Sequence, residues 1–291
     1  MYPTTDTCSP PTLPRPRTDG VTFLTAGPSP SIATCAGSAP SGSFHLGDCL
    51  VLDVENQVWK TGVIGQLLTS ENTHLAAVTM PVGVYLIGGT KARQKTEVLL
   101  AGTTHWQKGP QIPSYASMYV PCAVVISDRS FLAIYEKNII EFDTTAAGPT
   151  SNAGWKDSST YPRLQTSRTS WPGCAKLGSK VIISGGGYRN DYDDWRSHKS
   201  TEILDLTTKT LSVGGDLEEP RRHFHILNLH NKLFAIGGVN NAGFTSGNSA
   251  SISVEEWDPS TSTWSKSSTR LEEERASFGA LVVSEDLVCR P

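Results

Sequence analysis

Short apolar runs alternate with turns along almost the whole chain. The runs are four to six residues long, rich in Val, Ile, Leu and Phe, and bounded by Gly, Pro, Asn and Asp. Several end in a pair of small residues, as in Val84–Gly89 and Val181–Gly186. Helical periodicity is nearly absent. This pattern predicts an all-β protein made of short antiparallel strands.

One motif recurs at a constant spacing. A strand that ends in Asp is followed by Trp six residues later, as in Asp53 with Trp59 and Asp258 with Trp264. A third copy at the same spacing ends at Trp106, two degenerate copies end at Trp155 and Leu211, and a sixth copy, recognised by overlay, ends at Cys8; the period is about 50 residues. Each copy follows two other apolar runs, so the unit has four strands. Because one such sheet cannot bury both faces alone, the units are expected to stack in a ring.

The Gly pair, the strand ending in Asp and the Trp at fixed spacing resemble the repeats of the kelch family. The resemblance covers essentially the whole chain, and it implies a single kelch β-propeller over residues 1–291, similar to kelch-like proteins and the central domain of galactose oxidase. The number of copies predicts six blades, five of them complete. The expected blades are residues 20–62, 74–109, 119–158, 171–213 and 223–267, with the last split between residues 276–291 and 1–9.

The two chain ends are expected to form that last blade. Residues Ala276–Cys289 supply two strands, and Tyr2–Cys8 resembles the turn and the fourth strand. The third strand is mostly missing. The sixth blade is therefore predicted to be incomplete, and the sequence to be a fragment or a gene model with a lost exon.

The resemblance also implies a binding surface, formed by the loops between blades and after the Gly pairs on one face. Arg and aromatic residues gather in these segments, and such side chains suit an acidic protein or peptide segment. The residues predicted to contact this partner are Arg17, Tyr119, Arg168, Trp171, Tyr188, Trp195, Arg222, His225, Phe244 and Arg275. In the alternative interpretation, the arginine stems only cover blade edges and the loop aromatics cap their own loops.

No catalytic sequence signature is present, so the chain is predicted to be a non-enzymatic adaptor or scaffold module without a cofactor. The alternative is a metal-dependent, lyase-like enzyme. Asn190, Asp194 and His198 follow a Gly pair at four-residue spacing, which is similar to the iron site of kelch-type nitrile-specifier proteins. Asn190 replaces the Glu of that site and removes a charged ligand. His223 and His225, which alternate along a strand, are a second and weaker metal candidate.

Charge and cysteine usage restrict the expected classes of partner, the expected metal sites and the expected location. The formal net charge of -3 gives no electrostatic reason for nucleic-acid or anionic-membrane binding. Neither a membrane-spanning apolar run nor a signal-peptide core is found. The six cysteines include no closely spaced zinc-ligand pair. We expect a cytoplasmic, monomeric protein with reduced thiols; in the alternative, Cys35 and Cys49 form a disulfide.

Overall fold

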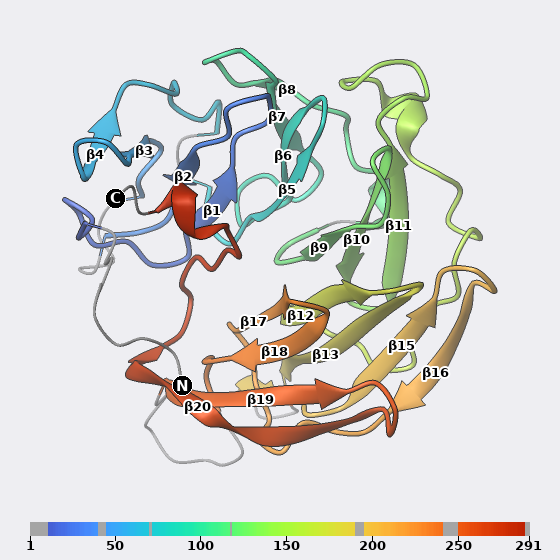
Figure 1. Ribbon diagram of the computed structural model, residues 1–291. Helices are drawn as coiled ribbons and strands as arrows, with labels where there is room; N and C mark the ends of the chain where they lie inside the picture. The colour runs from blue at the N-terminus through green and yellow to red at the C-terminus, as the bar shows by residue number, and fades with distance from the viewer. Residues whose placement is uncertain are drawn as a thin grey trace.

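Five antiparallel sheets stand around a common axis, like the blades of a propeller (Figure 1). The structure is a computed structural model that describes residues 11–39, 45–69, 72–116, 118–189, 195–240 and 250–288. Each sheet is a meander in which the first strand lies nearest the axis, and neighbouring inner strands contact one another around the channel.

The first two blades have four strands in chain order. Blade 1 consists of β1 (Val21–Leu24), β2 (Ile32–Cys35), β3 (Cys49–Asp53) and β4 (Val58–Thr61). Blade 2 consists of β5 (Ala76–Met80), β6 (Gly83–Ile87), β7 (Thr96–Leu100) and β8 (Gln107–Lys108).

Blade 3 has three strands, and the bridge between Phe142 and Trp155 stands where its fourth strand was expected. Its strands are β9 (Cys122–Val125), β10 (Ser130–Tyr135) and β11 (Asn138–Asp143). Blade 4 consists of β12 (Ser170–Leu177), β13 (Lys180–Arg189), β15 (Thr201–Asp205) and β16 (Thr210–Gly214), with β14 (Trp195–Ser197) paired to β13. Blade 5 consists of β17 (His225–Leu229), β18 (Lys232–Ile236), β19 (Ser251–Asp258) and β20 (Thr263–Arg275).

Helical structure among the described residues is limited to three 3-10 turns, none of which could cross a membrane. The turns are η1 (Ser114–Ala116), η2 (Asn152–Gly154) and η3 (Glu285–Leu287).

The hydrophobic core lies between the blades. Each of four buried clusters joins one blade to the next, from blade 1 through blade 5. The motif tryptophans reach into these interfaces: the ring of Trp106 packs edge to face on Phe23 of blade 1, and Nε1 of Trp264 donates to Oγ1 of Thr201 in blade 4 at 3.1 Å. The small pairs permit close approach as well, because a Cβ at Gly88 would collide with the carbonyl oxygen of Met118.

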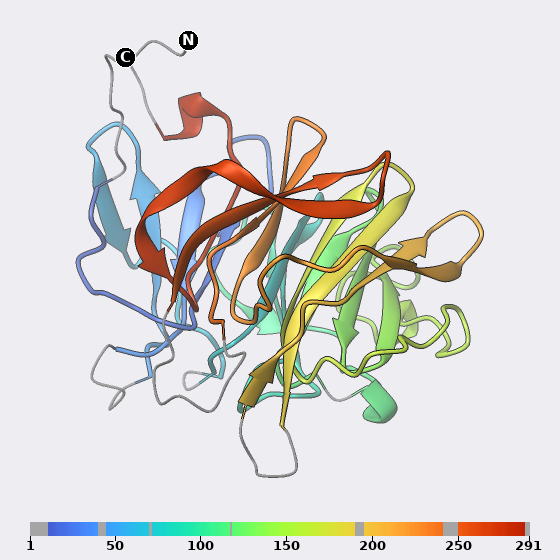
Figure 2. The same cartoon turned by 90° about the horizontal axis from the view of Figure 1, so that it is seen from below.

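The prediction of six blades is wrong, because the structure has five. Strand β20 continues to Arg275, beyond the expected end at 267, and the chain then passes from blade 5 to blade 1, where η3 lies beside β1 and β2 (Figures 1 and 2). Residues 276–288 occupy the sixth place without forming a strand. The physical reason is that no described strand follows them to form a hairpin. Residues 1–9, the other expected half of that blade, lie outside the described residues.

The cysteines also differ from the expectation of reduced thiols. Cys35 pairs with Cys49 across β2 and β3, and Cys122 of β9 pairs with Cys174 of β12, which joins blades 3 and 4. Because disulfides persist in oxidising compartments, the predicted cytoplasmic location loses the support that reduced thiols gave it.

Candidate functional site

One end of the propeller carries the links between blades and the links between the second and third strands of each blade, because antiparallel strands place these links at the same end. We call this end the mouth face. Five residues at this face line the opening of the central channel, and we call them the mouth ring: Asp19, His74, Trp171, His223 and Ser277. Four come from blades 1, 2, 4 and 5, and Ser277 comes from the segment in the sixth place.

The backbone of the mouth ring is unusual. All five residues have left-handed φ values between 43° and 61°, which non-glycine residues seldom adopt, and Trp171 has the lowest. Backbone hydrogen bonds link ring members directly: His74 N–H donates to Asp19 O at 2.9 Å, Asp19 N–H to Ser277 O at 2.8 Å, and Ser277 N–H to His223 O at 3.2 Å. Ser277 therefore closes the ring although it belongs to no blade.

The side chains of the ring meet across the opening. Nε2 of His74 lies 2.9 Å from Oδ1 of Asp19. The indole of Trp171 stacks on the imidazole of His223 with ring centroids 3.3 Å apart. The indole also makes an edge contact with the imidazole of His74, with ring centroids 4.5 Å apart. Residues from opposite sides of the propeller thus form one contiguous cluster.

The protonation of the cluster follows from its contacts. Burial, followed by the charge of Arg222, lowers the pKa of His223 to about 3, so this imidazole is neutral near pH 7. Nη1 of Arg222 lies 2.9 Å from Nε2 of His223, and a guanidinium can only donate. Nδ1 therefore carries the proton and donates to Oγ of Ser277 at 2.5 Å. His223 cannot accept the Ser277 proton in this tautomer, so the pair is not arranged as a nucleophile with its base.

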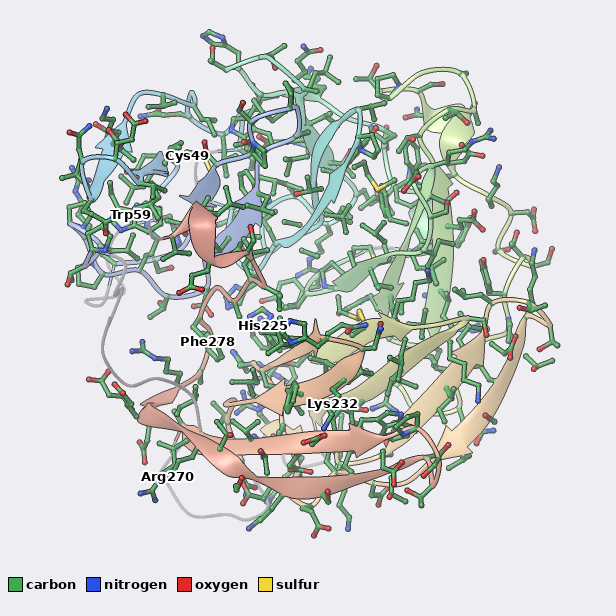
Figure 3. The ribbon with its side chains drawn as sticks, in the orientation of Figure 1. Cys49, Trp59, His225, Lys232, Arg270 and Phe278 are labelled. Atoms are coloured by element: carbon green, nitrogen blue, oxygen red, sulfur yellow. A yellow bond between two sulfur atoms is a disulfide. The ribbon has the colours of Figure 1, made fainter. Side chains whose placement is uncertain are left out.

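Asp19 supplies the negative charge of the ring. Burial raises the pKa of its carboxyl group, but the hydrogen bond and charge of His74 and a hydrogen bond from Ser277 outweigh burial and bring the pKa below its usual value. A cavity of ≈ 240 Å³ lies behind the ring, lined by inner strands and by the Cys122–Cys174 disulfide. His225, which was predicted to contact a partner, lies in this wall beside Phe278 (Figure 3), with its Nε2 2.6 Å from the Phe278 carbonyl oxygen.

A second set of side chains lies just before the mouth ring in sequence, and we call these residues the latches: Arg17, Asn72, Arg168 and Arg221. Arg221 donates from Nη1 to Gly237 O at 2.7 Å and to Ser253 O at 3.0 Å, and its Nη2 lies 2.8 Å from Oε1 of Glu255. The other latches likewise donate to the first residue of the small pair in their own blades, at Ala36, Gly88 and Gly185. The latches thus tie each incoming chain to its blade.

Comparison with known proteins supports this architecture. A sequence profile of the Kelch motif matches residues 220–269, which hold most of blade 5. The chain is a β-propeller with a Kelch motif in its fifth blade. A solved structure titled "Structure of YjhT" superposes on it with a TM-score of 0.69 at 11% sequence identity, covering 87% of this chain and 84% of that one. At this identity the likeness shows the fold alone. No curated protein matches the chain in sequence.

The propeller places two predicted contact arginines in its interior. Arg168 is fully buried, and the Arg17 side chain is 3% exposed and pairs with Asp48. Neither presents a surface to a partner, so the alternative interpretation, a structural role, describes them. Arg222 is buried as well, with its guanidinium facing the rings of His223 and Trp195.

The other predicted residues that the structure describes lie at the mouth face of the propeller. Trp171 belongs to the ring, and Tyr188 is 38% exposed and stacks on His198 at 4.6 Å. Trp195 is half-buried, and Cζ of Arg189 lies 5.0 Å from the centroid of its ring. Tyr119 is half-buried, Arg275 is exposed with Nη2 3.1 Å from Oε2 of Glu273, and Phe244 lies outside the described residues.

The metal alternative finds no support in the described part of the propeller. Asn190 and Asp194 lie outside the described residues. Nε2 of His198 lies 3.2 Å from the carbonyl oxygen of Ser167, and burial, followed by Arg168, lowers its pKa. Both nitrogens of His223 have partners and Nε2 of His225 has one. The described residues contain no group of three or more His, Cys, Asp or Glu side chains placed to hold a metal.

Sequence reasoning missed Asp19, His74 and Ser277 as site residues and chose Arg222 where Arg221 is the latch. A signal was available: Asp19, His74 and His223 each precede the first residue of an inner strand by two positions, and the latch lies two positions earlier still. Aligning the blades on their inner strands would have brought out both sets.

Proposed function

We propose that this kelch propeller is a non-enzymatic binding module that captures a protein or peptide at its mouth face. The observation that carries the proposal is Trp171: a large aromatic side chain is kept at the channel opening by a left-handed backbone, with φ of 43°. Such backbone conformations cost free energy and are concentrated at functional sites. Aromatic anchors near the centre of a surface are also typical of binding hot spots.

Neighbouring side chains support the same surface. Tyr188 adds an exposed ring, and Arg189 and Arg196 add positive charge beside Trp195. Aromatic residues and arginine are the side chains enriched at the energetic centre of interfaces. An acidic segment in the partner is part of this proposal. A monomeric state and a cytoplasmic location stay predictions.

Quantitative capture from a lysate of the source cells tests the proposal. The double variant Trp171→Gly and Tyr188→Ala should retain its fold and lose about tenfold or more of one specific captured protein, because it removes both anchors. The matched control is Leu229→Ala with Val58→Ala, which truncates two exposed apolar side chains, 42% and 44% exposed, at the opposite end of the propeller.

The control should capture the same protein as the unaltered chain. Proteins that both variants and the unaltered chain retain equally are background. If every captured protein falls in that group, the mouth face is not the binding surface and the proposal is wrong.

A further inference from the structure

Three cations project from one link at the mouth face. Lys91, Arg93 and Lys95 lie between β6 and β7 of blade 2, and all three side chains are exposed. None of them has a carboxylate among the described residues within ion-pair distance. Some cations elsewhere are paired, such as Lys199 with Asp216 and Lys232 with Glu256. The blade 2 link therefore presents positive charge that the described part of the molecule does not neutralise.

The backbone of this link is firmly held. Gly88 N–H donates to Lys95 O at 3.1 Å and Lys95 N–H to Ala92 O at 2.8 Å, which closes the link on itself. Lys91 N–H donates to Oδ1 of the latch Asn72 at 3.1 Å. Ala92 is 3% exposed and anchors the middle of the link in the protein. The three charges are thus presented by a backbone that needs little ordering when a ligand binds.

The central cation of the link is also oriented. Cζ of Arg93 lies 4.6 Å from the centroid of the Tyr119 ring, one of the predicted contact residues. A guanidinium stacked on a ring keeps its N–H groups directed outward in its own plane, where they can bind a carboxylate with two hydrogen bonds. Glu136 is an acidic residue near Arg93. Burial, followed by the charge of Glu136, raises the pKa of Tyr135 to about 12, and the charge of Arg93 acts on the same hydroxyl. Glu136 nevertheless makes no ion pair with Arg93.

We infer that Lys91, Arg93 and Lys95, with Tyr119, form the docking site for a carboxylate-rich segment of the partner. This inference rests on the proposed function and adds its partner's chemistry. Charge complementarity selects an acidic peptide. Nucleic acid is disfavoured, since three cations neutralise few phosphates and the net charge of the chain is -3. The site lies beside the mouth ring, so one partner can reach the aromatic cluster and the blade 2 link together.

Fluorescence anisotropy with labelled probes tests the inference. The probes are a peptide of alternating Glu and Gly, the same peptide with Ser for Glu, and a single-stranded oligonucleotide. The Glu peptide should bind best and weaken as NaCl rises. The triple variant Lys91→Ala, Arg93→Ala and Lys95→Ala should bind the Glu peptide about tenfold or more weakly, because all three cations attract its carboxylates during association.

The matched control removes the same charges from the opposite end of the propeller. It combines Arg129→Ala, Lys180→Ala and Lys209→Ala, which are all exposed and lie in or next to hairpin turns, and should bind the Glu peptide within about twofold of the unaltered chain. A second variant, Lys91→Glu with Lys95→Glu, should repel the Glu peptide whether or not the triple variant folds well.

Equal loss in both triple variants would show a non-specific charge effect and overturn the inference. So would equal binding of the Ser peptide or tighter binding of the oligonucleotide. None of these outcomes bears on capture through Trp171 and Tyr188, so the proposed function can stand if the inference fails. Conversely, loss of the captured protein only in the blade 2 variants would uphold the inference and contradict the central role of the mouth aromatics.

Discussion

The latches and the mouth ring lie two or three residues apart in the chain and behave in opposite ways. At the latch position the chemistry is constant: each side chain donates to the carbonyl oxygen of the first residue in the small pair, whether the donor is Arg or Asn. At the mouth position the backbone is constant and the side chains are varied, with Asp, His, Trp and His from blades 1, 2, 4 and 5 and Ser from the segment after blade 5. Constant bonding points to a role in folding. Varied side chains on one constrained backbone point to recognition.

The latches of blades 4 and 5 are arginines that pair with buried glutamates, although Nε of Arg168 has no hydrogen-bond partner among the described residues. In blade 5, Glu255 pairs with Arg221 and accepts backbone hydrogen bonds from Glu218 N–H at 2.7 Å and Glu219 N–H at 3.1 Å. In blade 4, Glu202 accepts equivalent bonds from Gln165 and Thr166. Buried charges of this kind are tolerated because each has an opposite charge beside it, and removing one partner leaves the other uncompensated.

The largest expected effect comes from breaking a charged latch. Arg221→Ala should lower the free energy of unfolding by about 3–5 kcal/mol, because it leaves Glu255 and the Gly237 carbonyl buried without their donor. Urea denaturation monitored by tryptophan fluorescence measures the change. Arg275→Ala, which removes an exposed arginine at the end of β20 in the same blade, should change stability by less than about 0.5 kcal/mol. Similar losses of unfolding free energy in both variants would mean that the latch arginine stabilises the fold no more than an exposed arginine does.

The mouth ring should instead make stability depend on pH. His223 has its pKa lowered to about 3 in the folded protein, so the unfolded chain takes up a proton that the native state excludes. The resulting loss of stability begins as pH falls through about 6.5 and grows towards pH 3, at up to about 1.4 kcal/mol per pH unit, with no contribution above that window. Burial lowers the pKa values of His198 and His225 as well, and these act in the same direction.

His223→Gln isolates the contribution of this residue. Between about pH 6.5 and pH 5 the unaltered chain should lose about 1–2 kcal/mol more than the variant, because only the unaltered chain excludes that proton. Urea midpoints measured across the pH range give the comparison. Parallel curves of stability against pH would show that His223 has the same pKa in the folded and unfolded protein.

The all-β repeat was readable from the sequence because the Asp-to-Trp spacing reflects a fixed hairpin geometry, and Trp106 and Trp264 do pack into neighbouring blades. The blade count was not readable. The sequence Phe278–Val283 has the apolar pattern of an inner strand, but a strand also needs a partner with which to pair, and local pattern carries no information on that partner. Strand propensity therefore predicted the inner strand of a sixth blade, where the described residues form only a connecting segment.

The mouth face was predicted in part. Trp171 and Tyr188 lie there because the order of strands fixes which links share an end, and that order follows from the repeat. The burial of Arg168 could not be seen, since an arginine in a link looks solvent-exposed until Glu202 and the Gly185 carbonyl are known to surround it. The blade 2 link was missed because its three cations lie in a segment that carries no repeat residue.

The smallest expected effect on stability belongs to Trp171. This prediction distinguishes the mouth ring from the latches most clearly. Trp171→Gly loses the stacking on His223 but relieves the left-handed backbone, since glycine adopts φ of 43° without strain. The two contributions oppose each other, so the free energy of unfolding should change by less than about 1 kcal/mol. Trp171→Ala, which loses the same stacking and keeps the strain, should be less stable than the glycine variant. A loss with Trp171→Gly as large as that of Arg221→Ala would show that the mouth residue, like the latch, serves the fold, and the division between constant bonding and varied side chains would no longer mark the binding surface.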